Sequence, residues 1–247
     1  MKIRYLIIFT GISLAGIMFG CNQRIIPPIP TLYNIQGAVV RNIDNDSTVV
    51  TVTIKKNDTL ASSLTLLLGT DTLKYSSGVY KKSYNSDTAL TSGTHEIKLI
   101  DGDYTDSISF TIPSDVDISN VSLPDTRIDP GGLSVPFEWT IASGSIGYAY
   151  GVIMFDSTYI SSGFYQFVTT GATQTSIPPD AFRLSGHLDT GWYRVYVYAY
   201  SGVPIGGQNL PTGFPQGLTL NLSQESISGS FGAIVVSRPD SIQVVIE

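Results

Sequence analysis

Apolar and polar residues alternate with a period of two along most of this 247-residue chain, and a helical period of about 3.6 residues is nowhere sustained. Valine and isoleucine alternate with threonine in 48–54, and three leucines share one face of the run 63–68. Asp101-Gly102 lies between two alternating runs in 95–112, and an Asp-Gly pair in that setting is a strong signal of a β-hairpin. The alternation therefore predicts an all-β fold.

The strand runs fall into two groups separated by a break. With further runs at 34–41 and 72–84, about seven strands are expected within 33–113, the number typical of an immunoglobulin-like β-sandwich. Prolines bound the segment that follows and the alternation stops there, so we interpret 114–124 as a linker. A second group of runs fills 125–247, and we expect two immunoglobulin-like β-sandwiches in tandem.

Three features of the second group resemble a fibronectin type III domain. Trp139 lies where that family has the tryptophan of an early core strand, and Tyr148 or Tyr150 lies where it has the tyrosine of the third strand. The segment 188–199, Leu-Asp-Thr-Gly-Trp-Tyr-Arg-Val-Tyr-Val-Tyr-Ala, is similar to the family's Leu…Tyr-x-Val-x-Val-x-Ala segment. The resemblance implies that Tyr193 is the tyrosine corner of this module.

The second group also departs from the fibronectin type III pattern. Leu188 and Tyr193 are one residue closer than usual, and 203–230 is a long insertion before the final strand at 241–247. Because that fold supports many functions, the resemblance implies a binding or spacer module and no particular activity.

Residues 1–20 have the layout of a secretory signal peptide. Lys2 and Arg4 form a short basic region, and an uncharged, almost wholly apolar run follows as far as Phe19. As a helix this 15-residue run would rise only about 22 Å, which is less than the roughly 30 Å of a bilayer's hydrocarbon core. Cleavage is therefore favoured over a membrane-spanning anchor.

Cys21 is the only cysteine of the chain, so no internal disulfide can form. Its position after the apolar run and Gly20 resembles the lipobox of bacterial lipoproteins, although Met18 and Phe19 replace the usual leucine and small residue. In that family the signal peptide is cut before the cysteine, whose thiol carries diacylglycerol and whose new amine is acylated. The resemblance implies lipidation of Cys21 and attachment to a membrane through that lipid.

The segment 21–32 is predicted to be a lipidated tether. Three of the four residues in 27–30 are prolines, which favour an extended, semi-rigid chain. Asn22 follows the cysteine in place of the aspartate that resembles an inner-membrane retention signal in enteric lipoproteins. We therefore predict a lipid-anchored location in the outer membrane, with the periplasmic and the outward-facing leaflet both left open.

The charge balance argues against some partners. The whole chain has 14 basic and 20 acidic residues, and removal of 1–20 takes away two of the basic ones, Lys2 and Arg4. The mature chain thus carries a formal charge of −8, which disfavours nucleic acid and anionic membrane surfaces because both need basic patches.

No catalytic constellation is visible, and we predict that the chain is not an enzyme and holds neither cofactor nor metal. His95 and His187 lie in different modules, and His95-Glu96 lacks the second histidine of a zinc-hydrolase helix. Asp101-Gly-Asp103 and Asp44-Asn-Asp46 suit hairpin turns better than calcium loops. A glycosidase needs two carboxylates across a cleft, and the sequence leaves such a pair open.

The strand predicted at 191–201 carries the candidate binding surface. The register fixed by Tyr-x-Val-x-Val-x-Ala leaves five side chains on the outer face, which we call the aromatic ladder: Trp192, Arg194, Tyr196, Tyr198 and Tyr200. Exposed aromatic stripes of this size usually contact a ligand. The alternative is that the first module or the insertion 203–230, with Leu210, Phe214 and Leu218, covers the ladder.

Two functions fit the sequence. The favoured one is a non-enzymatic module of the cell envelope that binds a protein or spaces partners from the membrane. The alternative is a glycan-binding accessory lipoprotein of a polysaccharide uptake system. An exposed aromatic ladder would favour the glycan-binding function, and a covered one would favour the scaffold.

Overall fold

The computed structural model describes residues 32–121, 134–155, 163–183, 190–205 and 210–245. The predicted signal peptide, Cys21 and nearly all of the tether lie outside these residues. The chain divides into two compact units, Met1–Pro30 and Thr31–Glu247, and only the second is described below.

Strands make up nearly all of the regular structure in the described residues. Their helical turns are two short 3-10 turns, Ser86–Thr88 and Pro179–Phe182. No helix in this part of the chain has the length and apolar character needed to cross a membrane.

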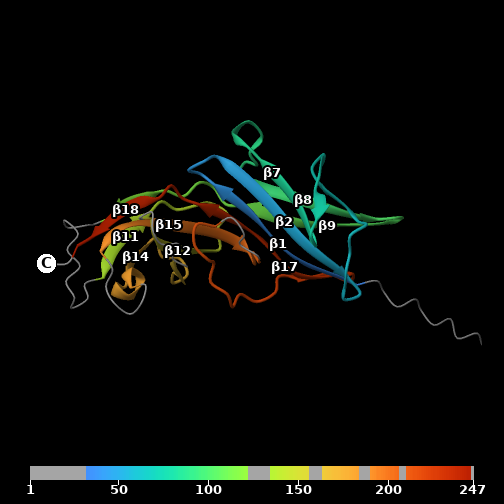
Figure 1. The fold of residues 1–247 in the computed structure, drawn as a ribbon. Coiled ribbons are helices and arrows are strands. Elements are labelled where there is room, and N and C mark those ends of the chain that lie inside the picture. Colours follow the sequence, from blue (N-terminus) through green and yellow to red (C-terminus); the bar gives the residue numbers. More distant parts are fainter. Residues whose placement is uncertain (1–31, 122–133, 156–162, 184–189, 206–209, 246–247) are drawn as a thin grey trace, which may run out of the picture. The chain divides into compact units, whose positions relative to one another are not determined.

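The largest sheet has eleven strands, and its main path runs in the order β13-β12-β15-β17-β1-β2-β7-β6 (Figure 1). Three short or peripheral strands pair onto it, β16 with β17, β18 with β15 and β3 with β2. Its strands are β1 (Tyr33–Asn42), β2 (Ser47–Lys56), β3 (Thr59–Leu60), β6 (Lys74–Ser76), β7 (Val79–Tyr84), β12 (Gly147–Met154), β13 (Phe164–Phe167), β15 (Gly191–Gly202), β16 (Leu222–Ser223), β17 (Ile227–Val236) and β18 (Asp240–Val244).

Two smaller sheets complete the architecture. One has the order β5-β4-β8-β9 and the other β10-β11-β14. Their strands are β4 (Thr65–Leu68), β5 (Asp71–Thr72), β8 (Gly93–Asp101), β9 (Tyr104–Ile112), β10 (Ile118–Val121), β11 (Val135–Trp139) and β14 (Gln174–Ile177). The hairpin predicted around Asp101-Gly102 is confirmed, because β8 and β9 pair up to Asp101 and Tyr104.

Each small sheet packs against a different part of the large one. Phe110 of β9 meets Phe231 of β17 with ring centroids 5.1 Å apart, and Phe137 of β11 meets Tyr150 of β12 at 5.4 Å. Side chains from both contacts belong to one continuous apolar core. The structure is therefore all-β and consistent with two immunoglobulin-like β-sandwiches in tandem, as the sequence predicts.

Two residues expected in the core of the second sandwich are buried there. Trp139 packs against Tyr148, with ring centroids 5.5 Å apart. The hydroxyl group of Tyr193 donates a hydrogen bond to the backbone carbonyl of Phe182 at 3.3 Å. A buried tyrosine that bonds to backbone upstream is the geometry of a tyrosine corner.

The predicted linker at 114–124 is wrong in part. Ile118–Val121 forms β10, which pairs with β11. Val116 is fully buried, so the segment contributes to the core instead of passing over the surface. Asp115 forms an ion pair with Arg41 of β1, which fastens the connection to the large sheet.

The predicted insertion at 203–230 also needs correction, because its last residues begin a central strand that the sequence did not reveal. β17 pairs in parallel with all ten residues of β1 and antiparallel with β15. Strands from both halves of the chain therefore join one continuous sheet. The two sandwiches share this sheet and the core that it carries.

Candidate functional site

Strand β15 has the register that the sequence predicts, but most of its outer face is not exposed. Trp192 and Arg194 are exposed as expected. Tyr196, Tyr198 and Tyr200 retain only 6%, 0% and 8% of their accessible surface. The prediction of an exposed aromatic ladder is therefore wrong for these three tyrosines, which cannot meet a ligand in this structure.

The side chains that cover the tyrosines come from 210–218, which we call the covering segment. Phe214 packs edge-on against Tyr200, with ring centroids 5.4 Å apart. The hydroxyl groups of Tyr198 and Thr212 lie 2.7 Å apart, and the backbone N–H of Thr212 donates to the same tyrosine oxygen at 3.3 Å. Burial raises the pKa of Tyr198 far above its ordinary value. The alternative that the insertion covers the ladder is thus the one that the structure supports.

Small residues on the neighbouring strand make room for the tyrosine rings. In the register of β12 and β15, Gly147 lies opposite Tyr200 and Gly151 lies opposite Tyr196. A Cβ atom on Gly147 would lie 2.5 Å from the hydroxyl oxygen of Tyr200, and one on Gly151 would lie 2.2 Å from the hydroxyl oxygen of Thr212. The spacing of Gly147, Ala149 and Gly151 is thus a sequence signal for large covered side chains on β15.

This second apolar cluster lies on the opposite face of the large sheet from the main core. Its members come from both halves of the chain: Ala38, Val40, Ala149, Tyr196, Tyr198, Tyr200, Phe214, Ile234 and Val236. The large sheet is therefore packed on both faces where the two sandwiches meet. The tyrosines of the aromatic ladder stabilise this junction.

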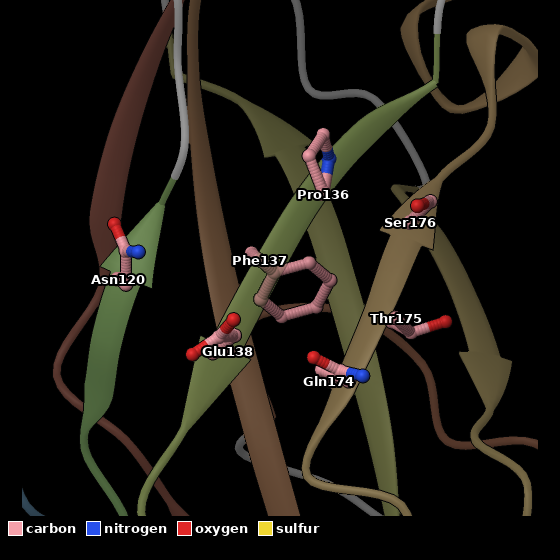
Figure 2. A pocket seen from close by; sticks show the side chains of 7 residues that line it. All are labelled: Asn120, Pro136, Phe137, Glu138, Gln174, Thr175 and Ser176. Atoms are coloured by element: carbon pink, nitrogen blue, oxygen red, sulfur yellow. The ribbon is translucent and has the colours of Figure 1, made fainter.

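The outer face of the three-stranded sheet contains a hollow of about 380 Å³ (Figure 2). It is lined by Asn120, Pro136, Phe137, Glu138, Gln174, Thr175 and Ser176. Glu138 on the middle strand lies between Asn120 on β10 and Gln174 on β14. Amide and carboxylate groups in one row can hydrogen-bond to a polar ligand. The lining has a single carboxylate, so it does not offer the pair that glycoside hydrolysis uses.

Other titratable residues singled out in the sequence have structural partners. The carboxylate of Asp101 accepts hydrogen bonds from the ammonium group of Lys56 at 2.5 Å and from the hydroxyl group of Tyr33 at 2.7 Å. The bond from Lys56 is the main cause of the lowered pKa of Asp101. His95 Nε2 lies 2.8 Å from the carbonyl oxygen of Thr91.

The remaining acidic turns are simple connections. Asp44 and Asp46 lie in the turn between β1 and β2, and Asp103 lies in the turn between β8 and β9. Within the described ranges, no three side chains of histidine, cysteine, aspartate or glutamate lie together as metal ligands would. His187 lies outside the described residues.

No family model matches the sequence, and no curated protein is similar to it. Solved structures with some likeness include a chimeric titin Z1Z2 fragment with 11% identity and a TM-score of 0.25, over 86% of this chain and 100% of that one. The three N-terminal domains of the bacteriophage RB49 highly immunogenic outer capsid protein give 13% identity and a TM-score of 0.29, over 87% and 70%. DIP-gamma IG1+IG2 gives 8% and 0.24, over 83% and 97%. Similarity at this level assigns neither a fold nor a function to this chain.

Proposed function

We propose that this chain is a lipid-anchored, non-enzymatic protein of the bacterial outer membrane that binds a partner protein or holds partners away from the membrane. The observation that carries this proposal is the burial of Tyr196, Tyr198 and Tyr200 beneath the covering segment. Because these rings stabilise the fold, the glycan-binding alternative loses the exposed ladder on which it depended.

The continuous sheet supports the role of a spacer. Tyr33 pairs with Ile227 at one end of β17, and Val236 at the other end pairs with Tyr198 of β15. β15 then continues in the same direction to Trp192. Tyr33 and Trp192 are therefore about 15 residues apart along the strands, or at most about 50 Å at roughly 3.3 Å per residue.

Lipid attachment is supported by the sequence around Cys21. In the Cys21→Ser variant we expect a protein that is neither lipidated nor cleaved, because the transfer of diacylglycerol requires a thiol. In the wild type, mass spectrometry should find an acylated cysteine as the first residue. The Met18→Leu variant is the matched control, since it brings the sequence closer to the lipobox and should be processed at least as completely.

Fractionation of the envelope completes this test. The wild-type protein should remain with outer-membrane vesicles after washing with high salt, since several acyl chains anchor a protein far more firmly than one. An intact Met1 in membrane-extracted wild-type protein would overturn the proposed anchor.

A further inference from the structure

The covering segment leaves one end of β15 open. There the outer face of the large sheet carries Phe155, Trp192 and Gln243 in one row across three adjacent chain segments. The next row along the strands contains Arg194 and Ser241. We call these five residues the Trp192 platform.

Exposed aromatic side chains and an arginine meet on this platform. Trp192 is 46% exposed and Phe155 is 41% exposed. The backbone N–H of Phe155 donates to the carbonyl oxygen of Trp192 at 3.1 Å, which holds the two residues opposite each other. The guanidinium carbon of Arg194 lies 4.5 Å from the centre of the Phe155 ring.

Arg194 has charge to offer to a partner. Among the residues that the structure describes, no carboxylate forms an ion pair with it. The chain as a whole carries a net charge of −6, so an unpaired exposed arginine is not part of a general basic surface. Stacking on Phe155 restrains the planar guanidinium group, whose N–H groups match the two oxygens of a carboxylate.

We propose that the Trp192 platform is the partner-binding surface of this protein, and that the partner is a protein presenting a carboxylate beside apolar side chains. The inference rests on the proposed function and names the site and the chemistry of its partner. Tryptophan and arginine are the residues enriched at the energetic centres of protein interfaces. A sugar fits less well, because the guanidinium group of Arg194 already covers one face of the Phe155 ring.

The position of the Trp192 platform agrees with the role of a spacer. It lies at the end of β15 that is farthest along the strands from Tyr33, the first residue of β1. A partner bound there meets the protein at the opposite end of the sheet from the point where the tether joins it.

Tryptophan fluorescence can test the proposal directly, because the chain has only Trp139, which is buried, and Trp192. The probes are three: a twelve-residue peptide alternating glutamate with leucine and phenylalanine, the same peptide with lysine in place of glutamate, and an oligogalacturonate. Full mature protein in detergent is titrated with each probe, and quenching by acrylamide reports how accessible Trp192 remains. We expect the acidic peptide alone to protect Trp192.

Matched variants assign the charge. Arg194→Gln should weaken the acidic peptide about tenfold, as expected for a lost charge-assisted hydrogen bond, and Arg194→Lys should restore part of the affinity. Lys81→Gln removes an exposed cation from β7 and should change nothing. Thermal melts of all three variants should match the wild type, which excludes unfolding as the cause.

Three outcomes would overturn the proposal: equal protection by the acidic and basic peptides, protection by neither, or stronger protection by the oligogalacturonate. The assay does not depend on the lipid, because the protein is already in detergent. An unprocessed amino terminus would therefore overturn the anchor and leave the Trp192 platform standing, whereas a failed titration would do the reverse.

Discussion

Single side chains decide which part of β15 is free to bind. Tyr198 is fully buried and bonds through its hydroxyl group to Thr212 of the covering segment, whereas Trp192 on the same face of the same strand is 46% exposed. The difference follows from what lies above each residue, and alternation along the strand does not encode it. An outward position in a strand thus predicts a face of the sheet but not its exposure.

The hydrogen bonds of Tyr198 can be measured by removing one atom. In Tyr198→Phe the ring still fills its site, and the loss of the hydroxyl group should lower the free energy of unfolding by about 1 kcal/mol at pH 7. Urea denaturation measures this difference. Tyr75→Phe, with an exposed ring that is not covered, should stay within about 0.5 kcal/mol of the wild type.

The same variant has a predictable pH dependence. The pKa of Tyr198 is raised in the folded protein because the side chain is buried, whereas in the unfolded chain it ionises near pH 10. Above about pH 10 the unfolded state therefore loses a proton that the folded state keeps, and wild-type stability falls. Phenylalanine has no proton to lose, so the advantage of the wild type over Tyr198→Phe should shrink as the pH rises above 10. An advantage that grows above pH 10 would contradict the assignment of the buried hydroxyl.

At the scale of strands, the elements with plain alternation could be predicted and the central one could not. The hairpin of β8 and β9 was evident because an Asp-Gly turn joins two regular runs. β17 was missed because Gly229 and Gly232 interrupt its apolar pattern, and glycine ordinarily disfavours strands. In the structure these glycines are required by close packing, since a Cβ atom would lie 2.0 Å from the carbonyl oxygen of Ile35 at Gly229 and 2.3 Å from that of Ser201 at Gly232.

The candidate site shows the same limit. The sequence fixes which side chains of β15 share a face, because the register depends only on the local pattern. It does not reveal that Phe214 and Thr212 return to cover three of them, since that contact depends on the path of an irregular segment. Phe155 was not singled out either, because its contact with Arg194 exists only across the paired strands.

The close approach of β17 to β1 can be tested at Gly229. Gly229→Ala should destabilise the protein by about 3 kcal/mol or more, because overpacking and a backbone φ of +126° both oppose the methyl group. Gly217→Ala is the control, since its φ is +108° and nothing lies within 4 Å of the added atom. It should cost only the strain of the backbone, about 1–2 kcal/mol. Equal losses in the two variants would mean that contact with β1 does not limit this position.

At the scale of the whole folded part, the shared sheet bears on how the protein unfolds. β17 belongs to the second half of the chain by sequence, yet it pairs along its full length with β1 of the first half. The apolar core is continuous from Leu66 in the first sandwich to Trp139 in the second. Arg41 and Arg238 form ion pairs with Asp115 and Asp117 in the connection between them. These contacts leave no flexible boundary at which one sandwich could unfold alone.

We therefore expect a single cooperative transition, which a core substitution far from β17 can test. Trp139→Ala should cost about 3–5 kcal/mol, since it opens a large cavity in the second sandwich. If the shared sheet couples the sandwiches, amides of β8 and β9 in the first sandwich should lose protection from hydrogen exchange together with those of β11. Leu66→Ala, which makes a cavity in the first sandwich, should in turn expose β11. Retention of full protection in β8 and β9 by the Trp139→Ala protein, under conditions where β11 exchanges, would show that the sandwiches unfold independently despite the strand that they share.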